Sequence, residues 1–193
     1  MNFALADLPS HILTEFLHVK KIIVVSLFQV VNSNCTPILL SPRNVGSLEH
    51  ILRTVGDGAM SVPDPLMKKT CVQFFKELTD QWLGNPNNGN DASIMRGYQT
   101  YLLEEFLPGM FNLFFSSEFN EKDAMQFRVV RETAGIFFLL KSKCGVQIEQ
   151  IIARIVASKS AQSTNILAAI NTATSKADIE KCIKSLLQSL KHK

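Results

Sequence analysis

The sequence predicts an all-α chain in which helical hairpins stack side by side into a right-handed solenoid. Apolar residues recur at helical spacing along most of the 193 residues. No segment alternates apolar and polar residues in the way that a half-buried strand requires. Successive helical hairpins are predicted to begin near Pro9, Ser47, Ile94 and Gly145, at intervals of roughly 40 to 50 residues.

The first apolar stretch, residues 9–31, predicts one helix or a pair of helices. Its β-branched part, Ile22 to Val31, is the best candidate for a strand, but a lone strand would have no partner, which favours helix. The run from Ile22 to Val31 is the longest apolar stretch and is broken by Ser26 and Gln29. It is too short to cross a bilayer, which needs about 20 apolar residues. Residues 35–44 contain two prolines and are predicted to be a connector.

The second hairpin carries the clearest helical signals. Ser47 is a candidate N-cap for a helix that runs to about Ala59. Asp64 can cap the following helix, and Pro65 suits its first turn because the missing amide hydrogen has no partner there. This helix carries an aromatic stripe and is expected to end at Gly84.

A polar loop at residues 84–93 separates this hairpin from the third. A linker is the default interpretation of the loop, and a functional loop is the alternative. The third hairpin is predicted to contain a helix from about 94 to 115, bent at Pro108, and a second helix that starts near Asp123.

Three further helices are predicted in the remainder of the chain. They cover residues 146–156, residues 166–173 and a last helix that follows Ser175. Ser175 and Asp178 have the spacing of a capping box, and the last helix has an apolar face and a lysine-rich face.

The interval between hairpins is typical of HEAT or armadillo repeats, in which each hairpin buries its apolar face against its neighbours. We therefore expect residues 1–193 to form a single α-α superhelix with a broad concave surface. A solenoid segment taken from a longer array should leave its first helix poorly covered, here at Ile12 and Phe16.

Composition argues against an enzyme, a cofactor or a metal centre. No nucleotide-binding, hydrolase or zinc-protease motif occurs, and the four histidines are scattered. The cysteines, which are expected to be reduced and in the core of an intracellular protein, lack zinc-site spacing. They are Cys35, Cys71, Cys144 and Cys182.

The basic residues are the main candidates for a binding function. The net charge of +3 permits an RNA or an acidic protein partner without requiring either. Basic side chains that recur on the inner helices of a solenoid would follow a phosphate backbone. The alternative is that they are ordinary solvated side chains. The RNA-binding candidates are Lys68, Lys69, Arg128, Arg131, Lys141 and Lys143, and the last helix adds Lys181, Lys184 and Lys191.

The segment LEHILRTVGDGAMSVPDPLMKKTCVQFFKELTDQWLG, residues 48–84, resembles the C-terminal part of the exportin-T family of tRNA export receptors. The most specific part is PDP-x3-K-T-C at residues 63–71, followed by a helix that ends in Trp82-x-Gly84. The segment EFLPGMFNL at 105–113 is similar to the next helix of the family, and from Asp123 onward only the helical pattern agrees.

The resemblance implies an importin-β-like superhelix that binds tRNA with Ran-GTP, passes nuclear pore proteins, and shuttles between nucleus and cytoplasm without membrane insertion. It also implies that Ran is held mainly by N-terminal repeats that this chain, several-fold shorter than the family, lacks. The alternative function is a helical-repeat scaffold for proteins, such as another transport receptor or an assembly factor. A basic face would favour RNA, and an apolar or acidic groove would favour protein.

Overall fold

The computed structural model describes residues 9–84, 92–120, 122–145, 150, 153–154 and 163–191. Every regular element in these residues is helical, which confirms the predicted all-α class. None of these helices is long and apolar enough to cross a membrane. The elements are α1 (Ser10–Asn32), η2 (Thr36–Ile38), η3 (Val45–Ser47), α2 (Leu48–Met60), α3 (Pro65–Gly84), α4 (Ala92–Tyr101), η4 (Leu102–Phe106), α5 (Leu107–Phe114), α6 (Ala124–Cys144), α8 (Ser163–Thr172) and α9 (Lys176–Lys191).

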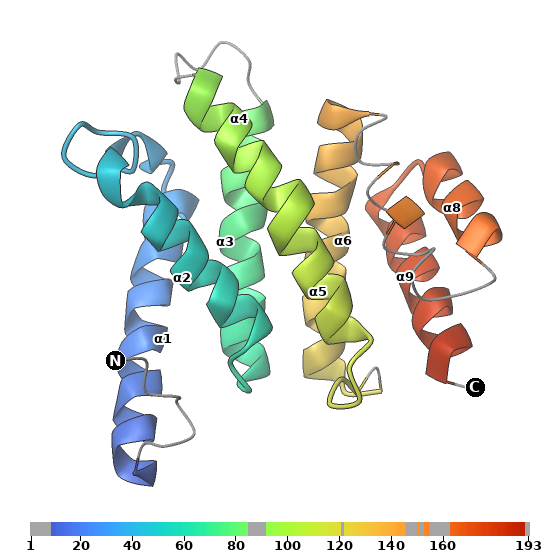
Figure 1. Ribbon diagram of the computed structural model, residues 1–193, viewed down its shortest axis with the longest axis horizontal. Helices are drawn as coiled ribbons and strands as arrows, with labels where there is room; N and C mark the ends of the chain where they lie inside the picture. Colours follow the sequence, from blue (N-terminus) through green and yellow to red (C-terminus); the bar gives the residue numbers. More distant parts are fainter. Residues whose placement is uncertain are drawn as a thin grey trace.

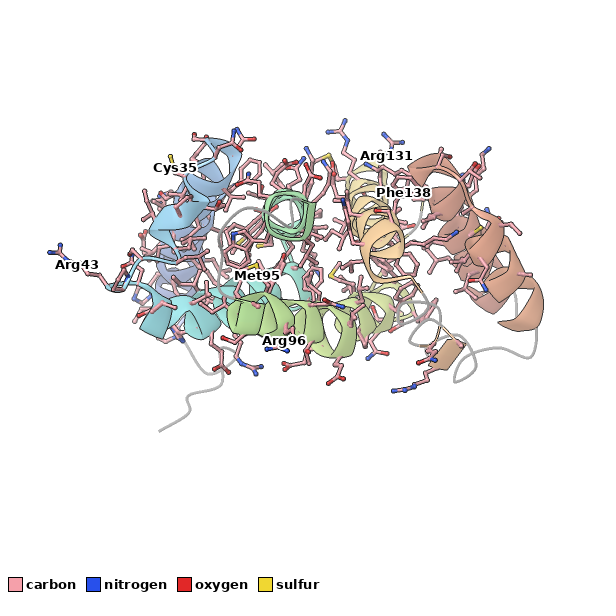
Figure 2. All side chains as sticks on the ribbon, turned by 90° about the horizontal axis from the view of Figure 1, so that it is seen from above. Cys35, Arg43, Met95, Arg96, Arg131 and Phe138 are labelled. Carbon is pink, nitrogen blue, oxygen red and sulfur yellow. The ribbon has the colours of Figure 1, made fainter. Side chains whose placement is uncertain are left out.

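Two layers of helices make up the structure (Figures 1 and 2). The helices α1, α3, α6 and α9 lie side by side in what we call the long-helix layer. The helices α2, α4, η4 and α5 lie across it and form the cover layer. Helix α3 is central because it packs against α1, α2 and α6.

The first apolar stretch is one helix, α1, rather than a pair. Its residues Val24 and Val31 are buried on the side that packs against α3. Gln81 of α3 fixes the C-terminal end of α1, since its amide donates to the carbonyl of Val31 at 2.7 Å and its Oε1 accepts from Thr36 at 2.9 Å.

The second hairpin, α2–α3, forms as predicted apart from one cap. Asp64 accepts a hydrogen bond from the amide of Leu66 at 2.9 Å and so caps α3, which ends at Gly84. Ser47 makes no capping hydrogen bond, contrary to the prediction. It belongs to η3, a 3-10 turn that leads directly into α2 and takes the place of a side-chain cap.

Where the sequence predicts a bend at Pro108, the structure has a π-helical turn just before this residue. The helix that begins at Ala92 widens over Leu102–Phe106 and then continues as α5. The amide of Leu107 donates to the carbonyl of Leu102, five residues back. Proline has no amide hydrogen, and in a regular α-helix its ring would clash with the carbonyl of Glu104, so the wider turn accommodates it.

The last helix reverses the direction that regular repeats would give it. Helices α1, α3 and α6 run parallel, whereas α9 runs antiparallel to α6 (Figure 1). The contacts show the reversal, because Arg131 pairs with Glu180 while Glu132, one residue later, pairs with Lys176. The last unit therefore departs from a simple repeat. The helix predicted at 146–156 lies mostly outside the described residues.

The helix starts predicted near Asp123 and Ser175 are both present. Asp123 caps α6 by accepting from the amides of Met125 and Gln126. At α9, Ser175 and Asp178 form the predicted capping box, with the Ser175 amide donating to Asp178 at 3.0 Å and the Asp178 amide donating to Ser175 Oγ at 3.2 Å. The hydrogen bond from the Ser175 hydroxyl holds the pKa of Asp178 below its usual range.

Aromatic rings and glycines join the two layers. Phe75 of α3 packs against Phe106 of η4 with ring centroids 4.3 Å apart. Helix α2 approaches the C-terminal end of α4 closely because Gly56 has no side chain. A Cβ there would collide with the hydroxyl oxygen of Tyr101, which donates to the carbonyl of Leu52 at 3.3 Å. The glycine thus sets the distance between α2 and the end of α4.

We predict that Gly56→Ala destabilises the protein. Overpacking at a close contact costs about 1–3 kcal/mol, which outweighs the gain of about 1 kcal/mol in helix propensity. Tyr101→Phe removes the oxygen that the new methyl would meet and should recover most of the lost stability in the Gly56→Ala background. The measurement is the free energy of unfolding from urea titration.

Gly97 provides the matched control, because it lies in α4 with nothing within 4 Å of its would-be Cβ. There Gly97→Ala should stabilise the protein by up to about 1 kcal/mol. Equal effects at Gly56 and Gly97, or no rescue by Tyr101→Phe, would contradict the predicted close contact.

The cysteines differ more than predicted. Cys71 is buried in α3, as expected, whereas Cys35 follows α1 and is exposed, contrary to the expectation of a core residue. Cys182 is half-buried, and the side chain of Cys144 lies outside the described set. Burial raises the pKa of the Cys71 thiol to about 12 and also raises that of Cys182.

We therefore predict that thiol reagents modify Cys35 first at neutral pH. The thiolate is the reactive form, so the buried Cys71 should react only when the chain unfolds. Peptide mapping by mass spectrometry after brief alkylation, with and without urea, measures this order. Modification of Cys71 as fast as Cys35 in the native protein would show that the α2–α3 interface opens readily.

Candidate functional site

Five basic residues form a row across the outward surface of the long-helix layer. Lys69 stands one turn before Gln73 on α3, and Arg128 stands one turn before Glu132 on α6. Gln73 donates to Glu132 at 3.1 Å, so this register sets Lys69 and Arg128 level with each other. The basic row consists of Lys69, Arg128, Arg131, Lys181 and Lys184.

The reversal of α9 brings its lysines to this row. Lys184 lies over the ring of Phe127, with its Nζ 5.4 Å from the centroid. Arg131 pairs with Glu180 at 3.3 Å and keeps a side chain that is 54% exposed. Arg128 and Lys184 are both exposed, and Arg128 forms no ion pair with any described residue. Figure 2 shows Arg131 on the outer side of α6, away from the cover layer.

Lys68, a candidate from the sequence, faces away from the basic row. Its ammonium donates to the carbonyl of Met60 at 3.3 Å and lines a small pocket beside Glu118 and Phe119. Partial burial lowers the pKa of Lys68, while the nearby charge of Glu118 acts in the opposite direction. Neighbours in sequence on a helix point about 100° apart, which explains why Lys68 and Lys69 separate.

Lys141 has a structural role that the sequence did not reveal. Its ammonium donates to the carbonyls of Ile170, Asn171 and Ala173 at 2.6–2.9 Å. These carbonyls lie at the C-terminal end of α8, where that of Ile170 also accepts from the amide of Ala173 at 3.2 Å. A cation there also complements the helix dipole. Lys143 is exposed at the same end of α6, roughly 20 Å along the helix from the basic row.

The centre of this surface is charged but nearly neutral in sum. Lys76 of α3 and Lys176 of α9 both reach Glu132, at 3.7 and 3.8 Å, across Gly135 of α6. Lys76 also contacts Glu77 at 3.1 Å. Sequence reasoning did not select these lysines. Helical spacing from Lys69 could have found Lys76, but only the reversal of α9 brings Lys176 here.

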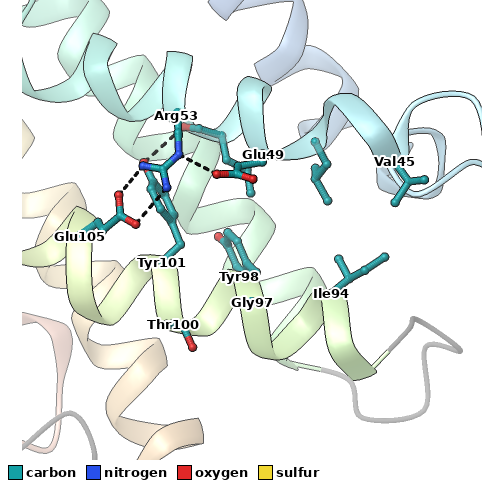
Figure 3. A pocket seen from close by; sticks show the side chains of 11 residues that line it. Val45, Glu49, Arg53, Ile94, Gly97, Tyr98, Thr100, Tyr101 and Glu105 are labelled. Carbon is teal, nitrogen blue, oxygen red and sulfur yellow. Dashed lines mark hydrogen bonds and ion pairs between the residues drawn. The ribbon is translucent and has the colours of Figure 1, made fainter.

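An apolar groove of about 410 Å³ opens between α2 and α4, on the cover layer (Figure 3). Sequence reasoning missed it because its lining residues have the spacing and character of core residues. Tyr98 is fully buried and bonded to Thr79 at 2.9 Å, and burial raises its pKa. The apolar part of the lining consists of Val45, Leu48, Leu52, Ile94, Tyr98 and Tyr101.

One end of this groove is closed by a charged clamp. Arg53 of α2 donates to both carboxylate oxygens of Glu105 and to Glu49 at 3.0 Å (Figure 3). Its guanidinium also lies 6.0 Å from the ring centroid of Tyr101. The hydrogen bonds to Glu105 and Glu49 raise the pKa of Arg53 above its ordinary value. Through these hydrogen bonds Arg53 holds α2 against the π-helical turn.

The described residues contain no group of three or more histidines, cysteines and carboxylates placed to hold a metal ion. The arrangement of this part of the chain offers surfaces for binding: a basic row on one layer and an apolar groove on the other.

Comparison with known proteins gives a consistent result. A family model described as Exportin-T matches residues 14–192. Among curated relatives, Exportin-T from Danio rerio is 22% identical over 127 residues, covering 66% of this chain and 12% of that protein. Exportin-T from Coprinopsis cinerea is 28% identical over 131 residues (65% and 12%), and that from Homo sapiens is 23% identical over 127 residues (66% and 12%).

This chain thus spans about 12% of the length of these relatives. No solved structure matches it. Since the family model covers nearly all of the sequence, the chain belongs to the exportin-T family.

Proposed function

We propose that this chain forms part of the RNA-binding wall of a nuclear export receptor that carries tRNA to the cytoplasm with Ran-GTP. The observation that supports this most is the basic row on the outward face of the long-helix layer, in a chain that belongs to the exportin-T family. On this proposal the chain is a binding module rather than an enzyme, and it shuttles between nucleus and cytoplasm. Ran-GTP would bind chiefly outside this chain, as the resemblance implies.

The chemistry of the basic row suits a folded RNA. Guanidinium and ammonium groups on three neighbouring helices, exposed on α6 and α9 and half-buried at Lys69 of α3, can contact successive phosphates without reading bases. Arg131 is only partly neutralised by Glu180, because the pair is solvent-exposed and such pairs are weak. Of the six candidates from the sequence, we retain Lys69, Arg128 and Arg131 for this contact. Lys143 would make a separate contact with tRNA at the C-terminal end of α6. Lys68 and Lys141 donate hydrogen bonds to backbone carbonyls of the chain, which argues against their binding tRNA directly.

We predict that replacing Arg128 and Arg131 with alanine weakens the binding of any tRNA about equally. Because both side chains are expected to bind phosphates, the slope of log K against log salt should flatten by roughly one unit for each phosphate that is no longer neutralised. Helix content should not change, since both side chains are exposed. Fluorescence anisotropy of labelled tRNA over a range of salt concentrations measures both the affinity and the slope.

The control is the pair Arg43→Ala and Arg96→Ala, which removes the same charge from exposed residues elsewhere; Figure 2 shows Arg96 on the cover layer, opposite Arg131. This control should keep the wild-type slope. If both double variants flatten the slope equally, tRNA binding depends on net charge and the basic row is not the site.

The apolar groove favours a second function, that of a scaffold for proteins, and nuclear pore proteins are the partner class that the resemblance suggests. Binding there would depend on buried apolar area and should be nearly independent of salt. Ile94→Glu places a charge at the half-buried edge of the groove. It should abolish protein binding and leave tRNA binding intact, whereas the Arg128 and Arg131 variant should do the reverse.

A further inference from the structure

Glu132 of α6 carries a carboxylate on which side chains from two neighbouring helices converge. Its Oε1 accepts from the side-chain amide of Gln73 of α3 at 3.1 Å. Its Oε2 lies 3.7 Å from the ammonium of Lys76 of α3 and 3.8 Å from that of Lys176 of α9. Only 14% of the Glu132 side chain is exposed. The carboxylate therefore bonds mainly to the chain itself.

The two lysines reach Glu132 across Gly135, about one turn further along α6. A Cβ at Gly135 would lie 3.2 Å from Cδ of Lys76 and 3.5 Å from Nζ of Lys176, so the missing side chain leaves room for both. The two lysine side chains remain 31% and 36% exposed. Their ammonium groups thus lie at the surface, within reach of a polyanion that could compete with Glu132.

Lys176 depends on Glu132 more than Lys76 does. Lys76 also contacts Glu77 at 3.1 Å, whereas Lys176 makes no second ion pair with any residue that the structure describes. Lys176 also borders a hollow of about 370 Å³ that is lined by residues of α3, α6 and α9. Loss of the charge on Glu132 would therefore leave the ammonium of Lys176 beside open space.

Glu132 also divides the positive charge of this face. The basic row lies one turn before Glu132 along α6, and Lys143 is exposed roughly 20 Å from the row at the other end of the helix. Between them, the charges of the two central lysines are offset by Glu132 and Glu77. The face thus has two positive ends and a nearly neutral centre.

We propose that Glu132 is a specificity-determining residue that keeps polyanion backbones away from the centre of this face. The inference rests on the RNA-binding function proposed above. Double-helical RNA is rigid and carries its two backbones on either side of a groove, so it can touch both positive ends while the groove spans the centre. A flexible single strand follows a continuous line of positive charge, which the neutral centre interrupts. Glu132 thereby favours folded RNA over unstructured strands.

Glu132→Gln tests the proposal, because glutamine keeps an oxygen that can accept from Gln73 but removes the charge that holds Lys176. The probe is single-stranded poly(U), measured by fluorescence anisotropy with the full chain over a range of salt concentrations. The variant should bind poly(U) roughly twofold to fivefold more tightly, which is the effect of one solvent-exposed ion pair. The slope of log K against log salt should steepen by about 0.7 units, the value for one added phosphate contact on a single strand. Binding of tRNA should stay unchanged, so the preference for tRNA falls.

Three further variants separate the role of Lys176 from net charge. Glu132→Gln with Lys176→Met should return the poly(U) affinity and slope to wild-type values, because the released ammonium is gone. Lys176→Met alone should change neither, because Glu132 already holds this lysine. Glu104→Gln removes the same charge from an exposed residue of η4 on the cover layer and should also change neither. The free energy of unfolding from urea titration checks that each variant stays folded.

An unchanged poly(U) slope in Glu132→Gln, or an equal change in Glu104→Gln, would overturn the role of Glu132. Weaker poly(U) binding by Lys176→Met alone would overturn it as well, since that lysine would then already contact RNA. The proposed function fails separately. A wild type that does not bind tRNA, together with a steeper poly(U) slope in Glu132→Gln, would contradict tRNA binding and still support exclusion by Glu132. Normal tRNA binding with an unchanged poly(U) slope would overturn the inference alone.

Discussion

The structure depends on the burial of the apolar face of helix α3. Phe74, Phe75 and Leu78 have no exposed surface, and no single neighbour could cover them all. Helices α1 and α6 flank α3 within its layer, and α2 and η4 close it from the cover layer. A hairpin of this kind cannot bury its apolar surface alone, so stacking is a condition of stability.

Close approach of the cover layer requires local departures from regular helix. Gly56 lacks a side chain that would meet Tyr101 at the end of α4. The π-helical turn accommodates Pro108 and presents Glu105 toward α2. The same turn supplies Glu105 at the charged end of the apolar groove, whose wall on this side belongs to α4. A local departure from α-helical geometry thus forms part of the edge of the groove, and π-helical turns are frequent at functional sites.

Some charged side chains of the long-helix layer bond to other parts of the chain, and others remain exposed to solvent. Lys76, Lys176 and Glu132 tie three helices together at the centre, and Lys141 caps α8. Arg128, Lys181 and Lys184 remain exposed at one end of the face. Reversal of α9 creates this division, because it carries Lys176 to the centre and Lys184 to the outer end. A parallel α9 would exchange these positions along α6.

The sequence alone determined the helical class, most helix boundaries, including the start of α6 near Asp123, and the caps at Asp64 and Ser175. These features depend on spacing and on hydrogen bonds within a few residues. It also identified Arg128 and Arg131 as exposed neighbours. Tertiary structure decided which lysines face solvent, since Lys68 and Lys141 bond to carbonyls of other elements. It likewise decided the direction of α9 and the groove, which arise from contacts between residues far apart in the chain and have no local signature.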